Sequence, residues 1–145
     1  MLIDGDGMIF DNKLISKGEA GGKEAAGLLW KFVTEYAHQH MTNLPSDYKI
    51  VTRVYANLAG LGDICQRSGI VDRADMIENF ARGLTGSKQL FDFVDVGVGK
   101  DRADDKISGN LPPASWRIWL IMRRNIQITS LRLSLSTYSF WLLSR

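Results

Sequence analysis

The chain has 145 residues, of which 45% are hydrophobic and 23% charged, as expected for one soluble globular domain with a sizeable core. Its single cysteine, Cys65, excludes an internal disulfide, a multi-cysteine metal site and a zinc finger. No stretch approaches the roughly 18 apolar residues of a membrane span, and the acidic start lacks the basic leader of a secretory signal. We therefore expect an intracellular protein, cytoplasmic or nuclear, with no membrane partner.

The net charge of +2 conceals an uneven distribution along the chain. Residues 1–108 carry sixteen acidic and thirteen basic side chains, a net charge of −3, whereas residues 109–145 carry five arginines and no acid. The basic character therefore belongs to the C-terminal segment. Classing the whole chain as a basic nucleic-acid binder would be a mistake.

The first expected elements are a buried strand and a long helix. Residues 1–4 form a short apolar run that ends in Asp-Gly-Asp-Gly, which is typical of a strand running into a turn. Apolar residues at helical spacing predict a helix over residues 17–40, and Ser16 with Glu19 has the spacing of a capping box. Glycines such as Gly22 weaken its first turns by roughly 1 kcal/mol each relative to alanine.

The remaining elements alternate between strand and helix. A β-branched and aromatic run predicts a strand over residues 48–56, and the periodicity that follows predicts a helix over 58–67. A helix capped by Asp72, a strand over 90–98 and a helix over 101–108 complete the series. This order predicts an α/β fold, a three-layer sandwich in which helices cover both faces of a mainly parallel sheet.

The composition changes after residue 108. Residues 109–113 read Gly-Asn-Leu-Pro-Pro, which stops a helix, and three of the four tryptophans follow. Two interpretations are open: a basic, aromatic surface segment, or translated sequence that was never selected to fold. The second is preferred. We therefore assign residues 1–108 to a domain that is incomplete at its C-terminus and residues 109–145 to a basic, aromatic tail of doubtful fold.

Acidic or amide side chains follow each predicted strand. Asp4 and Asp6 end the first strand, Asn57 follows the second, and Asp95 lies near the end of the third. Because the carboxyl ends of parallel strands share one edge of a sheet, we expect these side chains to meet there. Oxygen ligands without cysteine or histidine favour Mg²⁺ or Mn²⁺, and no small-molecule cofactor is expected. The expected metal ligands are Asp4, Asp6, Asp95, Asp104 and Asp105.

A structural role for these residues stays open. Asp-Gly pairs are ordinary turn residues, and acids at a helix start stabilise its dipole by about 0.3–1 kcal/mol. Asp95 can simply close a strand, and the acids near residue 104 can cap the last helix. Asp4 and Asp6, directly after a buried strand, favour the functional interpretation more strongly.

Three segments resemble a known domain. LIDGDGMIFDN (2–12), LPSDYKIVTRVYANLAGL (44–61) and LFDFVDVGVGKDRADDKI (90–107) are similar to the uncharacterised domain that precedes the zinc fingers of fungal CCCH-type zinc-finger proteins. That domain in turn resembles the NYN branch of PIN-like nucleases, with a Rossmann-like fold. The resemblance implies divalent-metal-dependent ribonuclease chemistry on RNA, in which Asp4, Asp6, Asp104 and Asp105 are the catalytic acids.

The sequence departs from this pattern after residue 107. Such domains continue with another strand that carries a further acid or polar ligand, where this chain has GNLPPASWRIW, and the zinc fingers are not found. An inactive, truncated domain is therefore one expectation. A non-catalytic RNA- or protein-interaction module is the alternative. A second alternative is a haloacid-dehalogenase-like phosphatase, because DGDGM resembles its DxDG motif, with Asp4 as nucleophile and Asp6 as acid/base.

Overall fold

The computed structural model describes residues 1–6, 10–99, 101–109 and 121–122, the last two by their backbone alone. The strands are β1 (Leu2–Asp4), β2 (Thr52–Ala56), β3 (Phe91–Asp95) and β4 (Ile121–Met122). The helices are α1 (Asn12–Ile15), α2 (Glu19–His40), α3 (Leu58–Arg67), α4 (Met76–Ser87) and α5 (Arg102–Gly109). Helices and parallel strands thus alternate along the described chain, and the predicted α/β class is confirmed.

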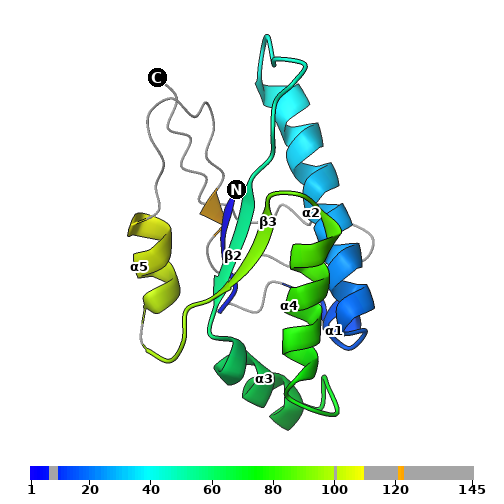
Figure 1. Cartoon of the computed structure of the whole chain (residues 1–145), viewed down its shortest axis with the longest axis vertical. Coiled ribbons are helices and arrows are strands. Elements are labelled where there is room, and N and C mark those ends of the chain that lie inside the picture. The colour runs from blue at the N-terminus through cyan, green and yellow to red at the C-terminus, as the bar shows by residue number, and fades with distance from the viewer. Residues whose placement is uncertain (7–9, 100, 110–120, 123–145) are drawn as a thin grey trace.

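The four strands form one sheet in the order β3-β2-β1-β4, and every neighbouring pair is parallel. Asp4 lies opposite Tyr55, and Asp95 lies opposite Ala56, so the carboxyl ends of β1, β2 and β3 are level with one another. Figure 1 shows α3 just beyond this end of the sheet. β4 comes from the segment that the sequence analysis assigned to the tail.

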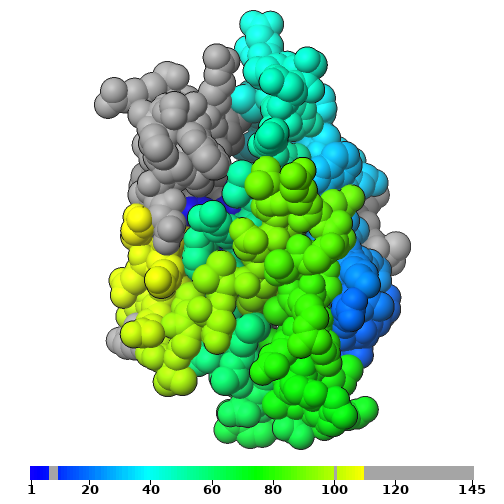
Figure 2. Space-filling model, in the orientation of Figure 1, coloured from blue at the N-terminus to red at the C-terminus, as the bar shows by residue number. Residues whose placement is uncertain are grey.

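Helices cover both faces of the sheet. Alternate residues of each strand point to opposite sides, so apolar residues at consecutive positions are buried on different faces. Ile3 and Val54 belong to a large buried cluster that includes residues of α1, α2, α3 and α4. Their neighbours Leu2 and Tyr55 belong to a smaller cluster on the other face, which α5 completes. Figures 1 and 2 show α5 at one side of the molecule and α1 and α2 at the other.

The two long helices α2 and α4 approach each other through glycine. A Cβ atom built on Gly22 would lie 2.0 Å from the Phe80 carbonyl oxygen, and one on Gly83 would lie 2.1 Å from the Glu19 carbonyl oxygen. Only glycine allows such close backbone approach. Gly22 has a low helix propensity, but in the folded protein it allows α2 and α4 to pack closely.

The start of α2 differs from the prediction. Ser16 caps the C-terminus of α1, a short helix that the sequence analysis did not predict, and its hydroxyl donates to the Lys13 carbonyl oxygen at 3.3 Å. The N-cap residue of α2 is Gly18, which has φ +54° and no side-chain cap. The predicted capping box is wrong because Ser16 belongs to the end of α1, where its hydroxyl bonds to that helix, and does not lie at the start of α2.

The other boundaries agree with the predictions to differing degrees. α3 spans the predicted residues 58–67, since Asn57 caps it and the apolar face packs on the core. Asp75, three residues later than the expected Asp72, is the N-cap residue of α4. The second and third strands are shorter than predicted, because pairing between them begins only at Thr52 and Phe91 and the third strand already ends at Asp95.

Candidate functional site

The sheet topology marks one position at its carboxyl edge. The chain proceeds from β1 outward to β2 and β3, and then returns to β4 on the other side of β1. The order of strands therefore reverses beside β1. In open parallel sheets, ligands bind outside the carboxyl ends of the strands at such a reversal. Asp4, the last residue of β1, lies at this position.

The segment that follows β1 lies directly against β2. The Gly5 N–H donates to the Tyr55 carbonyl oxygen at 2.7 Å, and a Cβ atom on Gly5 would lie 2.9 Å from Val54 Cγ1. The Asp4 side chain is buried, with 4% of its residue surface exposed, and its Oδ1 accepts the Asp6 N–H at 3.1 Å. A buried carboxylate and an exposed one, those of Asp4 and Asp6, thus follow each other at the end of β1.

Asp6 also contacts the start of α3. Its Oδ1 accepts the Asn57 N–H at 2.7 Å. The Asn57 side chain in turn accepts the Gly60 N–H at 3.0 Å, so it caps the helix that follows β2. The structure therefore brings together Asp4, Asp6 and Asn57, as the sequence analysis expected for the ends of neighbouring strands.

Asp95 lies on the other side of the α3 start. Its Oδ1 accepts the Leu58 N–H at 3.2 Å and the Gly97 N–H at 3.0 Å. A backbone amide at a helix start carries a partial positive charge, so an acid is favoured there. The backbone amides of Asn57, Leu58 and Gly97 are parts of this edge that the sequence analysis missed, because no side-chain motif identifies them.

The two remaining predicted acids are on α5. Asp104 is half-buried and Asp105 is exposed, while Ala103 and Ile107 on the same helix are buried against the sheet. Asp105 lines a hollow of about 520 Å³ together with Arg102 and Lys106. The lining of this hollow thus combines two basic side chains with one acidic side chain.

The described residues do not form a complete metal cage. Among them, no group of three or more histidine, cysteine, aspartate or glutamate side chains is arranged to hold an ion. The end of β1 supplies two carboxylates, Asp4 and Asp6, and each of them accepts a backbone N–H. Because Mg²⁺ commonly binds one or two carboxylates and completes its shell with water and substrate phosphate, this pair still fits such an ion. The larger ligand set stays a prediction.

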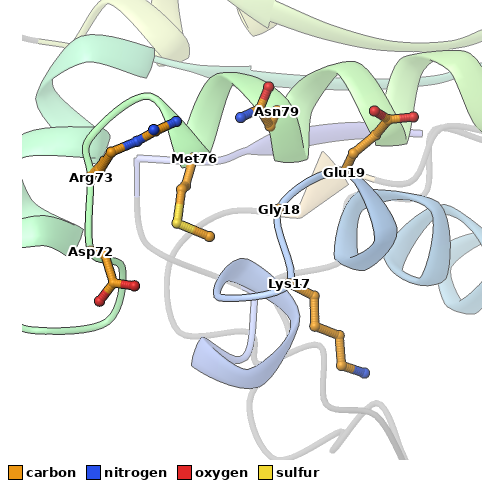
Figure 3. Close-up of a pocket in the computed structure, with 7 residues that line it drawn as sticks. All are labelled: Lys17, Gly18, Glu19, Asp72, Arg73, Met76 and Asn79. Carbon is orange, nitrogen blue, oxygen red and sulfur yellow. The ribbon is translucent and has the colours of Figure 1, made fainter.

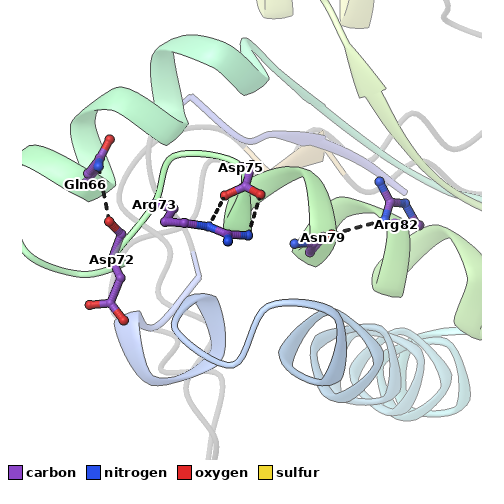
Figure 4. A network of polar contacts seen from close by, with 6 residues as sticks. All are labelled: Gln66, Asp72, Arg73, Asp75, Asn79 and Arg82. Atoms are coloured by element: carbon purple, nitrogen blue, oxygen red, sulfur yellow. Dashed lines mark hydrogen bonds and ion pairs between the residues drawn. The ribbon is translucent and has the colours of Figure 1, made fainter.

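A second hollow, of about 550 Å³, lies between the α1–α2 connection and the start of α4 (Figure 3). Lys17 and Arg73 line it, but Lys17 Nζ is 2.6 Å from Glu24 Oε2, and Arg73 makes two bonds to Asp75, of 2.7 and 2.9 Å. Figure 4 shows the second pair within a polar network along α4. Both cations are already neutralised, so this hollow offers no concentrated charge to a ligand.

Comparison with known families identifies the family of this chain. The family described as a domain of unknown function, DUF7923, matches residues 1–115. The chain belongs to this family. The DUF7923 match contains β1, β2, β3 and α5, and therefore all the predicted acids, and it includes residues 109–115, which the sequence analysis assigned to the tail.

Two further comparisons find no match: neither the curated proteins nor the solved structures contain one. Within the described part of the chain, none of the helices has the length and apolar character needed to cross a membrane.

Proposed function

We propose that this DUF7923 domain is RNA-associated and acts at the carboxyl edge beside β1, where acidic side chains hold a divalent cation against an RNA phosphate. The observation that carries this proposal is the position of Asp4, a buried carboxylate on the last residue of β1, where the strand order reverses. The resemblance of three segments to the CCCH-associated domain and the NYN/PIN-like nucleases supplies the substrate class. The α/β class of the fold is established above, whereas its closer similarity to the PIN-like nucleases is part of this proposal.

In this proposal Asp4 and Asp6 would hold Mg²⁺ or Mn²⁺, which would supply an activated water and neutralise charge on the phosphate. Asp4 is the more rigidly placed ligand because it is buried at the end of a central strand. In this proposal Asp104 and Asp105 on α5 would add carboxylates to the site, and Arg102 and Lys106 beside Asp105 would contact phosphate groups of the RNA backbone. Since Asp4 and Asp6 do not enclose an ion, RNA would supply further ligands, and we expect the cation and the RNA to strengthen each other's binding.

The test is a Mn²⁺ titration of the 145-residue chain, with and without a single-stranded RNA, followed by melting temperature and RNA cleavage. At a Mn²⁺ concentration roughly ten times Kd, we expect the melting temperature to rise by about 4 °C. Asp4→Asn keeps the shape of the side chain and removes its charge, so it should abolish the rise and any cleavage. Asp63→Asn, on the exposed face of α3, is the matched control.

The outcomes separate binding from catalysis. A rise that Asp4→Asn retains would remove Asp4 from the site. A parent that melts cooperatively with no Mn²⁺ response, in the presence of RNA as well, would contradict the proposed cation site. RNA binding and Mn²⁺ stabilisation without cleavage would retain the RNA-associated role and contradict the nuclease activity.

The second candidate is a non-catalytic RNA- or protein-interaction module. The bonds of Asp6 and Asp95 to backbone amides at the α3 start favour it, because they give both acids a structural role. This candidate predicts that RNA or protein binds equally well with and without Mn²⁺. The phosphatase alternative has less support, since its nucleophile would be Asp4, of which only 4% is exposed. Turnover of a phosphate monoester that Asp4→Asn abolishes would establish it.

A further inference from the structure

Asp95 lies where three segments meet: the end of β3, the start of α3 and the connection to α5. Its Oδ1 accepts one N–H from each of the latter two, those of Leu58 at 3.2 Å and Gly97 at 3.0 Å. We infer that Asp95 is a positioning residue, which holds α3 and the β3–α5 connection in place by hydrogen bonds, and that it is not a ligand of the cation. This assignment differs from the metal role that the sequence suggests for Asp95.

The bonds at the start of α3 form a matched pair. The N–H groups of two consecutive residues, Asn57 and Leu58, donate to acids from the two strands that flank β2: Asp6 after β1 and Asp95 at the end of β3. The α3 start is thus braced on both sides. Removing the hydrogen bond to Asp95 would let the start of α3 move relative to β3. Asp6 would move with it, because the Asn57 N–H donates to Asp6.

The second bond of Asp95 shapes the connection to α5. Gly97 has φ +67°, a left-handed conformation that glycine adopts readily, and its N–H points back to the Asp95 carboxylate. Arg102 on α5 closes the same connection from the other end, because its Nη1 donates to the Val96 carbonyl oxygen at 3.1 Å. Asp95 therefore links the segment that carries Asp6 to the helix that carries Asp104 and Asp105.

Hydrogen bonding and metal ligation can be separated by substitution. Asp95→Asn keeps an Oδ1 acceptor for both N–H groups and loses the charge, whereas Asp95→Ala loses the acceptor as well. A positioning residue tolerates the first change and is damaged by the second. A metal ligand is damaged by both. Asp6→Asn is the reference for a proposed metal ligand, because it loses the charge but keeps a side-chain oxygen that accepts the Asn57 N–H.

The experiment measures amide hydrogen exchange of Leu58 and Gly97 in the 145-residue chain, together with the Mn²⁺ titration in the presence of RNA. In Asp95→Ala we expect exchange at both amides to rise by about tenfold or more, the loss expected for a hydrogen bond to a charged acceptor, and the Mn²⁺ midpoint to rise. In Asp95→Asn we expect slow exchange and a Mn²⁺ midpoint close to the parent's, whereas Asp6→Asn should raise the midpoint strongly.

Two results would overturn the inference. One is unchanged exchange of Leu58 and Gly97 in Asp95→Ala. The other is an Asp95→Asn variant with slow exchange and a Mn²⁺ midpoint raised as much as in Asp6→Asn, which would make Asp95 a ligand. Only the effect on Mn²⁺ rests on the proposed function. If the parent shows no Mn²⁺ response, the proposed function fails, and the exchange rates alone still decide whether Asp95 holds the two segments.

Discussion

One face of the sheet is covered by α1, α2 and α4, with the apolar side of α3 at its edge, and the other face by α5. Among the described residues, the first face contributes to a cluster of seventeen buried hydrophobic residues and the second to a cluster of five. The candidate acids are divided between these two regions. Asp4 and Asp6 lie at the end of β1, a strand with residues in both clusters, whereas the positions of Asp104 and Asp105 depend on the docking of α5.

This difference suggests how the site is built. The end of β1 is rigid, because its residues are buried on both faces and its carboxyl end is tied to β2 and α3. α5 is anchored by Ala103 and Ile107 and by the connection that Asp95 and Arg102 hold. Regions with few buried apolar contacts open at lower free energy than the core. The α5 acids should therefore be the first part of the site to be lost when the fold is weakened.

The largest effect is expected in the larger cluster. Phe80 on α4 is 2% exposed, and its ring contacts that of Phe10 edge to face, with 5.0 Å between the centroids. Phe80→Ala should lower the free energy of unfolding by about 3–5 kcal/mol, as measured by chemical denaturation. The whole domain should be destabilised, so amide exchange should accelerate in α2, α4 and α5 together. Faster exchange confined to α4 would contradict this.

The contact between α2 and α4 gives the next effect. Gly22→Ala places a methyl group 2.0 Å from a backbone oxygen, so the helices must separate, and we expect a loss of up to about 3 kcal/mol. Gly27→Ala is the matched control on the same helix. Its Cβ atom meets nothing within 4 Å, so it should stabilise the protein by about 0.5–1 kcal/mol. Equal effects of the two substitutions on the melting temperature would show that helix propensity dominates.

A smaller and more local effect is expected on the α5 face. Ile107 is fully buried in the smaller cluster, and Ile107→Ala should cost about 2 kcal/mol, the lower end for a buried isoleucine. We expect amide exchange to accelerate in α5 while α2 and α4 stay protected. Acceleration of all three helices to the same extent would show that the two faces unfold as one unit.

The smallest effect concerns Cys65, which is buried in the larger cluster and can report its opening. Burial raises the pKa of the Cys65 thiol, so the folded protein holds less thiolate than free cysteine at the same pH. The stabilising contribution of the neutral thiol is present below about pH 8.5 and is lost at higher pH, as the unfolded chain ionises.

Labelling of Cys65 at pH 8 by a thiol reagent should be slow in the parent and in Ile107→Ala, and faster in Phe80→Ala. A parent that reacts at the rate of free cysteine would contradict the burial.

Much of the fold could be predicted from local sequence. The α3 boundaries could be predicted from the helical spacing of apolar residues such as Leu61 and Cys65, and the Asn57 cap and the packing reinforce them in the structure. The strands are recognisable from their apolar runs, although pairing decides where each begins. The short helix α1 was missed because it has only four residues, which gives hydrophobic periodicity too little length to be detected.

The candidate site could be predicted in position but not in the roles of its residues. Acids after buried strands and a parallel sheet place Asp4, Asp6 and Asp95 at one edge, because parallel strands end together. Whether such an acid binds an ion or a backbone amide depends on which N–H groups lie nearby. The contacts of Asp6 with Asn57 and of Asp95 with Leu58 join residues 51 and 37 positions apart, so no local pattern could show them.

The sequence by itself determined the α/β class, the alternation of strands and helices, and the identity of the acids at the ends of β1 and β3, because these depend on local periodicity and on residue type. The tertiary structure decided the rest. It turned Gly22 from a weak helix residue into a packing contact, moved the cap of α2 from Ser16 to Gly18, and gave Asp95 two backbone donors. Each of these depends on atoms that only folding brings within a few ångströms of one another.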